Sequence, residues 1–452
     1  MAQTHRDDIL SGPIGPKLVR LALPMVLGIA AIIFFNIVDT FWVGQLGAQQ
    51  LAAMSFTFPV VMVVMSVAMG LSIGGTAVIA RALGTGDDSQ VKRLTTDLLI
   101  LANLIVAAIA GIGLLTLEPL FAMLGASTQT RALIDQYMVP WYLGVGLLVI
   151  PMVGNGAIRA SGDTKTPSYV MLTAGLVNAG LDPLLIFGWG PVPALGLTGA
   201  ALATIGSYAG SFVVAFWILH KRERMLRFRL PKPDELMRSW GRILYVGLPA
   251  AGTNMLTPVA AGVLTRMVSQ YGEPAVAAFG VGTRIEGFAL VGINALGAAV
   301  TPFVAQNLGA GQFDRIWGAV RFCLRAALIW GAGVAVLLLV GAQPLARVFN
   351  AEPEVVATTA LFLSTVPLSY GLQGMAQVVA SALNALNRPL RAALLILVRL
   401  VVLAVPLAWL GSHWFGLVGV FGGMAVANAI IGVLAGWVAL RGLELPNAQA
   451  LS

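Results

Sequence analysis

Long apolar segments recur along the whole chain and leave few folds open to it. Runs of roughly 20 residues, the length that an α-helix needs to cross ~30 Å of hydrocarbon, recur about twelve times. A β-barrel is excluded, because the runs lack the alternation of apolar and polar residues that barrel strands show. With 58% hydrophobic and only 10% charged residues among 452, the sequence predicts an all-α membrane protein. The expected spans are residues 18–45, 50–81, 94–117, 131–157, 168–190, 195–219, 243–270, 275–305, 318–342, 355–382, 391–411 and 416–440.

Lysine and arginine residues gather in alternate loops between these segments. If the N-terminus is cytoplasmic, 27 − 4 = 23 of the 27 basic residues fall on the cytoplasmic side. Cytoplasmic loops retain basic residues, so both termini are expected in the cytoplasm. The net charge of +8 is then spread over the membrane surface and does not indicate nucleic-acid binding. The four exceptions are Arg131, Arg266, Arg284 and Arg347.

The chain contains an internal repeat. A shift of 225 positions brings Leu23-Pro24 onto Leu248-Pro249, and a later shift of 220 brings Gly196 onto Gly416. The repeat predicts two six-helix bundles of the same orientation, related by a pseudo-two-fold axis along the membrane normal. The expected division is an N-lobe over 1–219, a basic cytoplasmic linker over 220–242 and a C-lobe over 243–452.

Duplicated bundles of this kind are typical of secondary transporters, which open a central site to each side of the membrane in turn. The chain has no Gly-x-x-x-x-Gly-Lys-Ser/Thr phosphate loop, so ATP hydrolysis is not expected. The sequence therefore predicts a transporter driven by an ion gradient, with no catalytic residues and no organic cofactor.

Two carboxylates interrupt the apolar segments of the first half. Asp39 lies in the apolar stretch from Leu21 to Val43, and Asp182 lies in a second one. A carboxylate inside a membrane helix costs several kcal/mol or more, so it indicates a functional site. The repeat places Leu264 and Ala404 at the equivalent positions of the second half. The helices therefore pack without acids there, and the two acids are specific to the N-lobe.

These acids have polar neighbours on their own helices. Asn178 lies four residues before Asp182, and Asn36 lies three before Asp39, so each pair shares a helix face. Carboxylate and amide oxygens suit a proton or a hard cation such as Na⁺. Burial and a nearby like charge both favour the protonated carboxyl group. We expect the bound ion to compete with a cationic substrate, directly or by bending the first helix at Pro24.

Several motifs in the chain resemble those of the multidrug and toxic compound extrusion (MATE) family, and the similarity spans essentially the whole chain. Within the family, the chain resembles the DinF-like prokaryotic branch, whose acids lie in the N-lobe on helices one and five. The NorM-like branch has acids in the C-lobe, where this chain has Thr257 and Gly374. The motifs are Leu23-Pro24, Val38-Asp39-Thr40, Ala80-Arg81-x-Leu83-Gly84-x-Gly86, Arg159-Ala160-x-Gly162-Asp163-Thr164 and Asn178-x-x-x-Asp182-Pro183.

The resemblance implies proton- or sodium-coupled export of organic cations and amphipathic drugs by a multi-pass, monomeric protein of the bacterial inner membrane. By position it implies an ion site of Asp39, Asn178, Asp182 and Thr204, with no other metal. Thr198 is the alternative to Thr204, because the preceding loop varies in length. Pro24 matches the bend of helix one. The substrate cavity is expected to include Asn36, Asn155 and Met171.

Three alternatives remain open. Intramembrane aspartyl proteases also use two aspartates, but in Tyr-Asp and Gly-x-Gly-Asp motifs; here Val38 precedes Asp39 and Leu181 precedes Asp182. A flippase for lipid-linked precursors would be expected to carry a more cationic cleft. Arg284 and Glu286 lie together in helix eight, where a mutual or backbone-linked pair would form a structural tie or take part in C-lobe gating.

Overall fold

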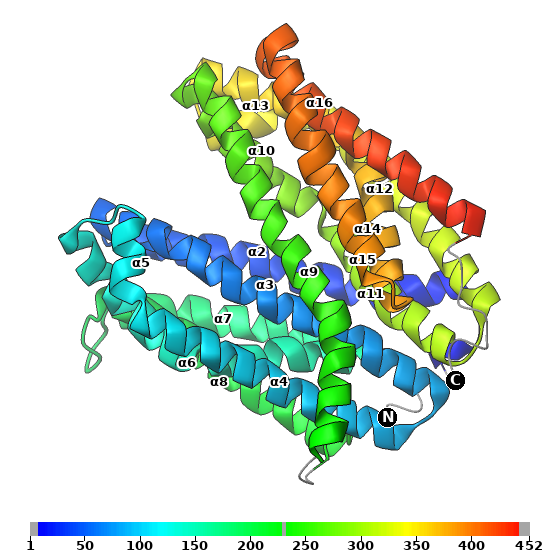
Figure 1. Ribbon diagram of the computed structural model, residues 1–452. Helices are drawn as coiled ribbons and strands as arrows, with labels where there is room; N and C mark the ends of the chain where they lie inside the picture. Colours follow the sequence, from blue (N-terminus) through cyan, green and yellow to red (C-terminus); the bar gives the residue numbers. More distant parts are fainter. Residues whose placement is uncertain (1–7, 228–231, 443–452) are drawn as a thin grey trace. The chain divides into compact units, whose positions relative to one another are not determined.

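The described residues, 8–227 and 232–442, fold almost entirely into helices in the computed structural model (Figure 1). An isolated bridge between Trp189 and Val192 is the one extended pairing in these ranges. The helices of the first half are α2 (Ile14–Gly44), α3 (Ala48–Thr85), α4 (Asp88–Leu115), α5 (Leu117–Met123), α6 (Thr128–Ala160), α7 (Lys165–Phe187), α8 (Gly196–Trp217) and the π-helical turn η1 (Ile218–Arg222). Those of the second half are α9 (Pro233–Val268), η2 (Ser269–Tyr271), α10 (Glu273–Ala289), α11 (Val291–Gly309), α12 (Phe313–Phe349), α13 (Pro353–Thr365), η3 (Val366–Ser369), α14 (Tyr370–Ala385), α15 (Pro389–Leu397), the π-helical turn η4 (Val398–Ala404) and α16 (Val405–Gly442).

The helices account for every expected membrane span. Within the described ranges, nine helical segments are long and apolar enough to cross a membrane, and α10 with α11, bent by 43° at their junction, makes a tenth. One of the nine, Pro389–Arg441, has 53 residues and would be ~80 Å long if straight. Its backbone turns at Gly416 (φ 59°), so it holds the two spans expected near 391–411 and 416–440. The remaining span is α9, which has 36 residues but a less apolar sequence.

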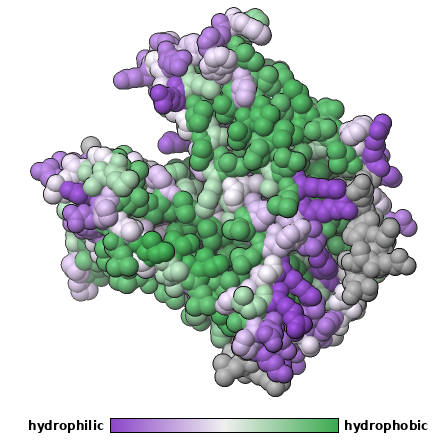
Figure 2. All heavy atoms as spheres, in the orientation of Figure 1, coloured by the Kyte–Doolittle hydropathy of each residue, from purple (hydrophilic) through white to green (hydrophobic). Residues whose placement is uncertain are grey.

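Apolar side chains cover the outer flanks of the helices, as a bilayer requires. On α12, for example, Ile329, Leu337 and Val340 are each more than 70% exposed. Hydrophobic residues form wide surfaces along the helices, and hydrophilic ones gather towards their ends (Figure 2). In water such a surface would be an aggregation site, whereas in a membrane it is the lipid-facing side.

The helices divide into two compact units. Among the described residues, the first unit is Leu27–Ala251, and the second is Asp8–Val26 together with residues 252–442. The division expected from the sequence, 1–219 and 243–452, differs from this in two places. The linker and the first half of α9 belong to the first unit, while the start of the chain belongs to the second.

Specific contacts hold the linker and the start of α9 in the first unit. Trp240 Nε1 donates a hydrogen bond to the Asp97 carbonyl oxygen at 3.0 Å, and the Arg227 amide donates to Thr96 Oγ1 at 2.9 Å. Further along α9, Gly247 packs against the backbone of α3. The linker residues 228–231, which include Pro231, lie outside the described residues.

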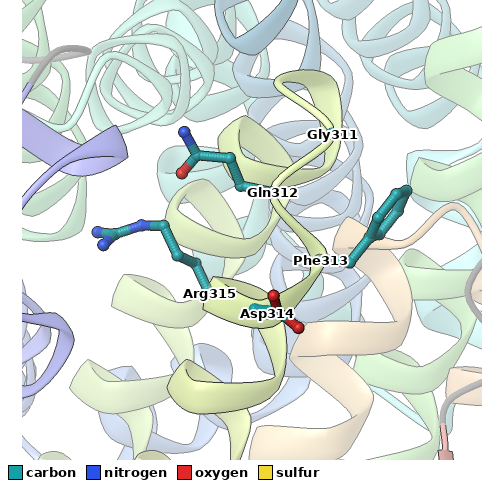
Figure 3. Close-up of a pocket in the computed structure, with 5 residues that line it drawn as sticks. All are labelled: Gly311, Gln312, Phe313, Asp314 and Arg315. Carbon is teal, nitrogen blue, oxygen red and sulfur yellow. The ribbon is translucent and has the colours of Figure 1, made fainter.

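Hydrogen bonds from Arg315 help to hold the start of the chain in the second unit. Arg315 Nη1 donates to the Gly12 carbonyl at 2.8 Å, and its Nη2 donates to the Ile9 carbonyl at 2.8 Å. Its Nε donates to Asn307 Oδ1 at 3.0 Å, which fixes the guanidinium on α11. Residues 311–315 line a hollow of about 380 Å³ at the turn between α11 and α12, where Arg315 points to the opposite side from Phe313 (Figure 3).

Both helices that pass from one unit to the other do so two residues after a proline. Helix α2 changes unit after Val26, two residues beyond Pro24, and α9 changes after Ala251, two residues beyond Pro249. Pro24 and Pro249 are equivalent in the repeat. A proline inside a helix removes one backbone hydrogen bond and weakens the helix locally, so both prolines lie where a helix bends most easily.

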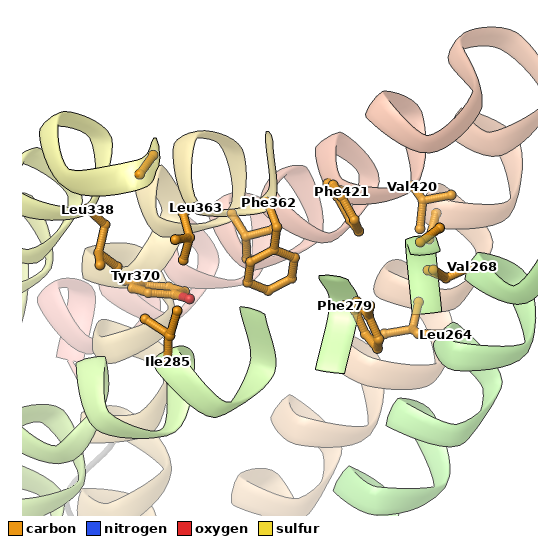
Figure 4. Close-up of a cluster of buried hydrophobic side chains, with 14 residues drawn as sticks. Leu264, Val268, Phe279, Ile285, Leu338, Phe362, Leu363, Tyr370, Val420 and Phe421 are labelled. Carbon is orange, nitrogen blue, oxygen red and sulfur yellow. The ribbon is translucent and has the colours of Figure 1, made fainter. Parts of the chain in front are cut away.

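The second unit has an aromatic core. Phe279 of α10 stacks on Phe421 of α16, with ring centroids 6.3 Å apart, and Phe362 of α13 meets Phe421 edge-on at 5.2 Å. Tyr370 lies in the same cluster, next to Ile285 (Figure 4). These side chains are buried, so they join α10, α13, α14 and α16 into one packed body.

Candidate functional site

The first unit holds a carboxylate with one satisfied oxygen and one bare oxygen. Asp182 of α7 has no exposed surface. Its Oδ1 accepts a hydrogen bond from Asn178 Nδ2 at 3.2 Å, as expected for two residues four apart on a helix. Its buried Oδ2 has no hydrogen-bond partner among the residues that the structure describes. Because an unpaired buried acceptor is unfavourable, a proton or a cation would be stabilised at this atom.

Close packing of α2 on α7 brings Asp39 towards Asp182. A Cβ atom on Gly175 would lie only 1.8 Å from the Phe35 ring, so this glycine lets the ring pack directly against the backbone of α7. Asp39 shares a helix face with Phe35 and Trp42, and Asp182 follows Gly175 by seven residues, or about two turns. Three pairs mark the contact: Gly28 with Ser168, Phe35 with Gly175, and Trp42 with Phe187.

Two tyrosines complete this cluster. Asp39 and Asp182 lie within electrostatic range of each other. Tyr137 of α6 lies within range of both acids, and Tyr208 of α8 lies within range of Asp39. Neither tyrosine was predicted from the sequence, although a phenol group in an otherwise apolar span was a signal that could have identified them. The cluster thus combines residues from four helices, with two carboxylates and two hydroxyl groups.

Three other polar residues predicted near the acids bond to the backbone and not to the acids: Thr204 and its alternative Thr198 from the ion site, and Asn36 from the substrate cavity. Thr204 lies one turn before Tyr208 on α8, which keeps it near the cluster, whereas Thr198 bonds to α6. The hydrogen bonds of these side chains run from Asn36 Nδ2 to Ile32 O at 2.9 Å, from Thr204 Oγ1 to Ala200 O at 3.1 Å, and from Thr198 Oγ1 to Gln136 O at 3.0 Å. None of these three bonds reaches Asp39 or Asp182.

The residues predicted for the cavity and the bend lie in different places. Asn155 of α6 is buried, and its Oδ1 has no partner within the described ranges. Met171 of α7 packs over Gly28 of α2, with its Sδ 3.3 Å from where a Cβ would stand. Pro24 belongs to the second unit, outside the acid cluster, and the backbone of α2 continues through it as a helix.

The second unit lacks the acids and has a different ionic arrangement. Leu264 and Ala404, at the positions equivalent to Asp39 and Asp182, are buried apolar residues. A mutual ion pair of Arg284 with Glu286, one of the two arrangements expected from the sequence, is not formed: Arg284 is exposed, and no ion pair joins the two among the described residues. Residues two apart on a helix point in different directions. Glu286 lies instead within electrostatic range of Arg399.

The cluster suits a light, hard ion and not a transition metal. No group of three or more His, Cys, Asp or Glu side chains that could hold a metal is present in residues 8–227 and 232–442. Two carboxylates, an amide and hydroxyl groups are the ligands that Na⁺ accepts, and the bare oxygen of Asp182 is equally suited to a proton.

A family model described as MatE matches this chain twice, at residues 24–184 and at residues 249–410. The two matches begin 249 − 24 = 225 positions apart, which is the offset of the sequence repeat. The chain belongs to the MATE family. It is therefore a multi-pass membrane transporter with the MATE fold and not an enzyme, and MATE transporters couple to H⁺ or Na⁺.

Three relatives show how similar this MATE chain is to known proteins. The FAD transporter of Shewanella oneidensis is 38% identical over 436 residues, which are 96% of each chain. The probable multidrug resistance protein YoeA of Bacillus subtilis is 26% identical over 395 residues, covering 85% of this chain and 84% of YoeA. The Vibrio cholerae MATE transporter VcmN, in its bent form, superposes with a TM-score of 0.89 and 31% identity over 97% of both chains. A mutant of VcmN reaches a TM-score of 0.92 with 30% identity, over 98% of this chain and 99% of VcmN.

Proposed function

We propose that this protein is a secondary active antiporter that exports an organic compound in exchange for H⁺ or Na⁺ bound by Asp39 and Asp182. The observation that carries the proposal is the buried, unpartnered Oδ2 of Asp182 beside a second carboxylate. Such a pair is stable in a membrane only when a cation or a proton reduces its charge.

The ion would bind where the two helices meet. A proton on Asp182 Oδ2 removes the charge of one carboxylate and supplies the missing hydrogen-bond donor. A Na⁺ ion would be held by oxygens of Asp39, Asn178, Asp182 and Thr204, with Tyr137 and Tyr208 within reach of the same acids. Binding of either ion changes the net charge in the cluster, and this change biases the two access states of the transporter.

Two classes of cargo fit this protein. Similarity to the FAD transporter supports a flavin dinucleotide as the cargo. That relative is 38% identical to this chain, whereas the probable multidrug resistance protein YoeA is only 26% identical. Organic cations and amphipathic drugs are favoured by the acids of the first unit, because two carboxylates attract a cation. We propose the flavin dinucleotide as the first candidate and the organic cations as the second.

Transport into proteoliposomes separates these possibilities. We expect an imposed gradient of H⁺ or of Na⁺ to drive FAD across the membrane in the opposite direction, as followed by flavin fluorescence. A cationic dye is tested in parallel, and the gradient that produces movement identifies the coupling ion. If neither compound moves faster with either gradient than in protein-free vesicles, the proposal is wrong.

We further propose that the chain belongs to the DinF-like branch. The proposal is supported by its two acids, which lie on the first and fifth spans, and by the apolar residues at the equivalent positions of the second unit. We propose that both termini lie in the cytoplasm, on the basis of the Lys and Arg distribution. The bacterial relatives support a place in the bacterial cytoplasmic membrane. The terminal residues 1–7 and 443–452 lie outside the described residues.

Pro24 is proposed to let α2 bend when the ion binds. Replacing Pro24 with alanine restores one backbone hydrogen bond and stabilises a straight helix by up to about 3 kcal/mol. We expect Pro24→Ala to slow ion-driven export about tenfold or more while the protein still folds. Pro140→Ala, in the interior of α6, is the matched control and should transport normally. Equal rates for Pro24→Ala and the wild type would exclude bending at this residue.

A further inference from the structure

A second polar cluster lies inside the second unit, on helices that depart from regular geometry. It includes Glu286 of α10, Tyr370 and Gln373 of α14, Arg399 of η4 and Asn428 of α16. Helix α14 follows a 3₁₀ turn, η3, and Arg399 is the second residue of the π-helical turn η4. Irregular turns inside membrane helices are tolerated where they are buried in protein, and they frequently mark functional sites.

Arg399 is buried near the middle of its membrane segment. It follows Pro389, the first residue of α15, by ten residues, which is roughly 15 Å along the helix. It is only 9% exposed. The sequence grouped it with the cytoplasmic basic residues, but a rise of this length would carry it about halfway into ~30 Å of hydrocarbon. A guanidinium at this depth is costly and stays charged, so a function or a partner must account for it.

The Glu286 carboxylate does not satisfy all the hydrogen-bond donors of the Arg399 guanidinium. Glu286 interacts electrostatically with Arg399, but no N···O distance between them is within 4.0 Å among the described residues. The Arg399 Nε–H has no acceptor in the described part of the chain, and neither has the hydroxyl of fully buried Tyr370, which is also close to Glu286. Two donors near one carboxylate therefore lack acceptors, an arrangement that favours an additional anionic group.

The remaining polar groups position the cluster. Asn428 Nδ2 donates to Gln373 Oε1 at 3.2 Å and to Ser369 Oγ at 3.2 Å, which ties α16 to the 3₁₀ turn. The side chain of Gln373 in turn lies next to Glu286. Tyr370 is fixed by the aromatic core and packs near Ile285, the residue before Glu286 (Figure 4).

The repeat shows that the two units carry opposite charges on equivalent helices. With the offset of 222, Arg399 is equivalent to Val177, which lies beside Asn178 on α7. The fifth span of the first unit thus carries an acid, Asp182. The matching span of the second unit carries a base, Arg399, within about two turns of the position equivalent to Asp182. The scaffold does not require an arginine there, because the first unit has a half-exposed valine at the equivalent position.

We propose that this cluster is an anion subsite of the transporter, in which Arg399 and Tyr370 donate hydrogen bonds to a phosphate or carboxylate group of the cargo. Glu286 balances the guanidinium when no cargo is bound and is displaced from it by the anionic group. The subsite deepens the proposed function, because it assumes that the exported compound binds here. The first unit would then hold the coupling cation and the second the anionic part of the cargo.

Binding of two flavins to the purified, full-length protein tests the subsite. FAD and riboflavin share the isoalloxazine ring, but only FAD carries a pyrophosphate. We expect the wild type to bind FAD at least about tenfold more tightly than riboflavin, as followed by flavin fluorescence. Arg399→Gln should remove this preference, since a charge-assisted hydrogen bond to phosphate corresponds to about tenfold or more in affinity. Arg347→Gln, exposed at the end of α12, should keep it.

Two further variants separate a binding role from a structural tie. Glu286→Gln removes the competing carboxylate, so FAD should bind several-fold more tightly. The double variant Glu286→Gln, Arg399→Gln removes both charges and should fold even if Arg399→Gln does not, because no charge is left uncompensated. We expect the double variant to melt near the wild-type temperature and still to lack the preference for FAD.

The proposal is overturned if the wild type binds the two flavins equally or binds neither, or if the double variant regains the preference for FAD. These outcomes do not depend on ion coupling, because no gradient is present in the binding assay. Ion-driven export of a cationic dye without FAD binding would leave the antiport proposal intact and exclude the anion subsite. If FAD binding depends on Arg399 but no gradient drives transport, the anion subsite is supported and the antiport proposal is wrong.

Discussion

Replacing Asp182 with asparagine is expected to abolish ion-driven export while the protein stays folded. Asparagine has nearly the same size as aspartate but cannot take up a proton or hold a full negative charge. The variant should therefore lose the response to an imposed H⁺ or Na⁺ gradient, with export falling to the level of protein-free vesicles. Asp39→Asn is expected to have the same direction of effect, because both acids share one cluster.

The fold should tolerate this change, since removal of an unpaired buried charge is neutral or stabilising. The apolar residues Leu264 and Ala404 occupy the equivalent positions of the second unit. Glu118→Gln is the matched control, because it also converts one carboxylate to an amide but lies on a side chain that is 83% exposed. An Asp182→Asn protein that still exports its cargo in response to the gradient would show that coupling takes place elsewhere.

Replacing Gly331 with alanine is expected to cause a large loss of stability. Gly331 of α12 packs directly on Gly371 of α14, and a Cβ at Gly331 would lie 2.1 Å from the Gly371 amide nitrogen. The clash involves backbone, so the two helices must separate. Overpacking of this kind costs about 1–3 kcal/mol or more, and the melting temperature of the purified protein should fall accordingly.

Gly333 provides a control two residues away on the same helix. A Cβ there would meet nothing within 4 Å. Gly333→Ala should therefore be neutral or stabilise the helix by about 0.5–1 kcal/mol, as alanine has the higher helix propensity. If both variants melt at the same temperature, the close approach of α12 and α14 does not contribute to stability.

Much of the architecture follows from local properties of the sequence. The number of spans depends on apolar length, and the repeat depends on matching residues 225 positions apart, which the two family matches confirm. The pairing of Asn178 with Asp182 was also predictable, because residues four apart on a helix face each other whatever surrounds them.

The partners of the charged residues were harder to predict. Arg284 lies two residues from Glu286, and the sequence favoured this pair, but the helix directs the two side chains apart and leaves Glu286 near Arg399. Tyr137 and Tyr208 were missed for the same reason, because their proximity to Asp39 depends on how α6 and α8 rotate and pack.

The sequence by itself determined that this chain is a duplicated bundle of membrane helices, with Asp39 and Asp182 in its first half and apolar residues at the equivalent positions of its second half. These features are encoded in hydrophobic length, periodicity and residue identity, which need no knowledge of distant contacts. Only the tertiary structure decided which groups meet, that Asp182 keeps one oxygen bare, and that α2 and α9 change unit just after Pro24 and Pro249. These facts depend on helix rotation and on close approach at glycines such as Gly175, which are set by packing across the whole fold.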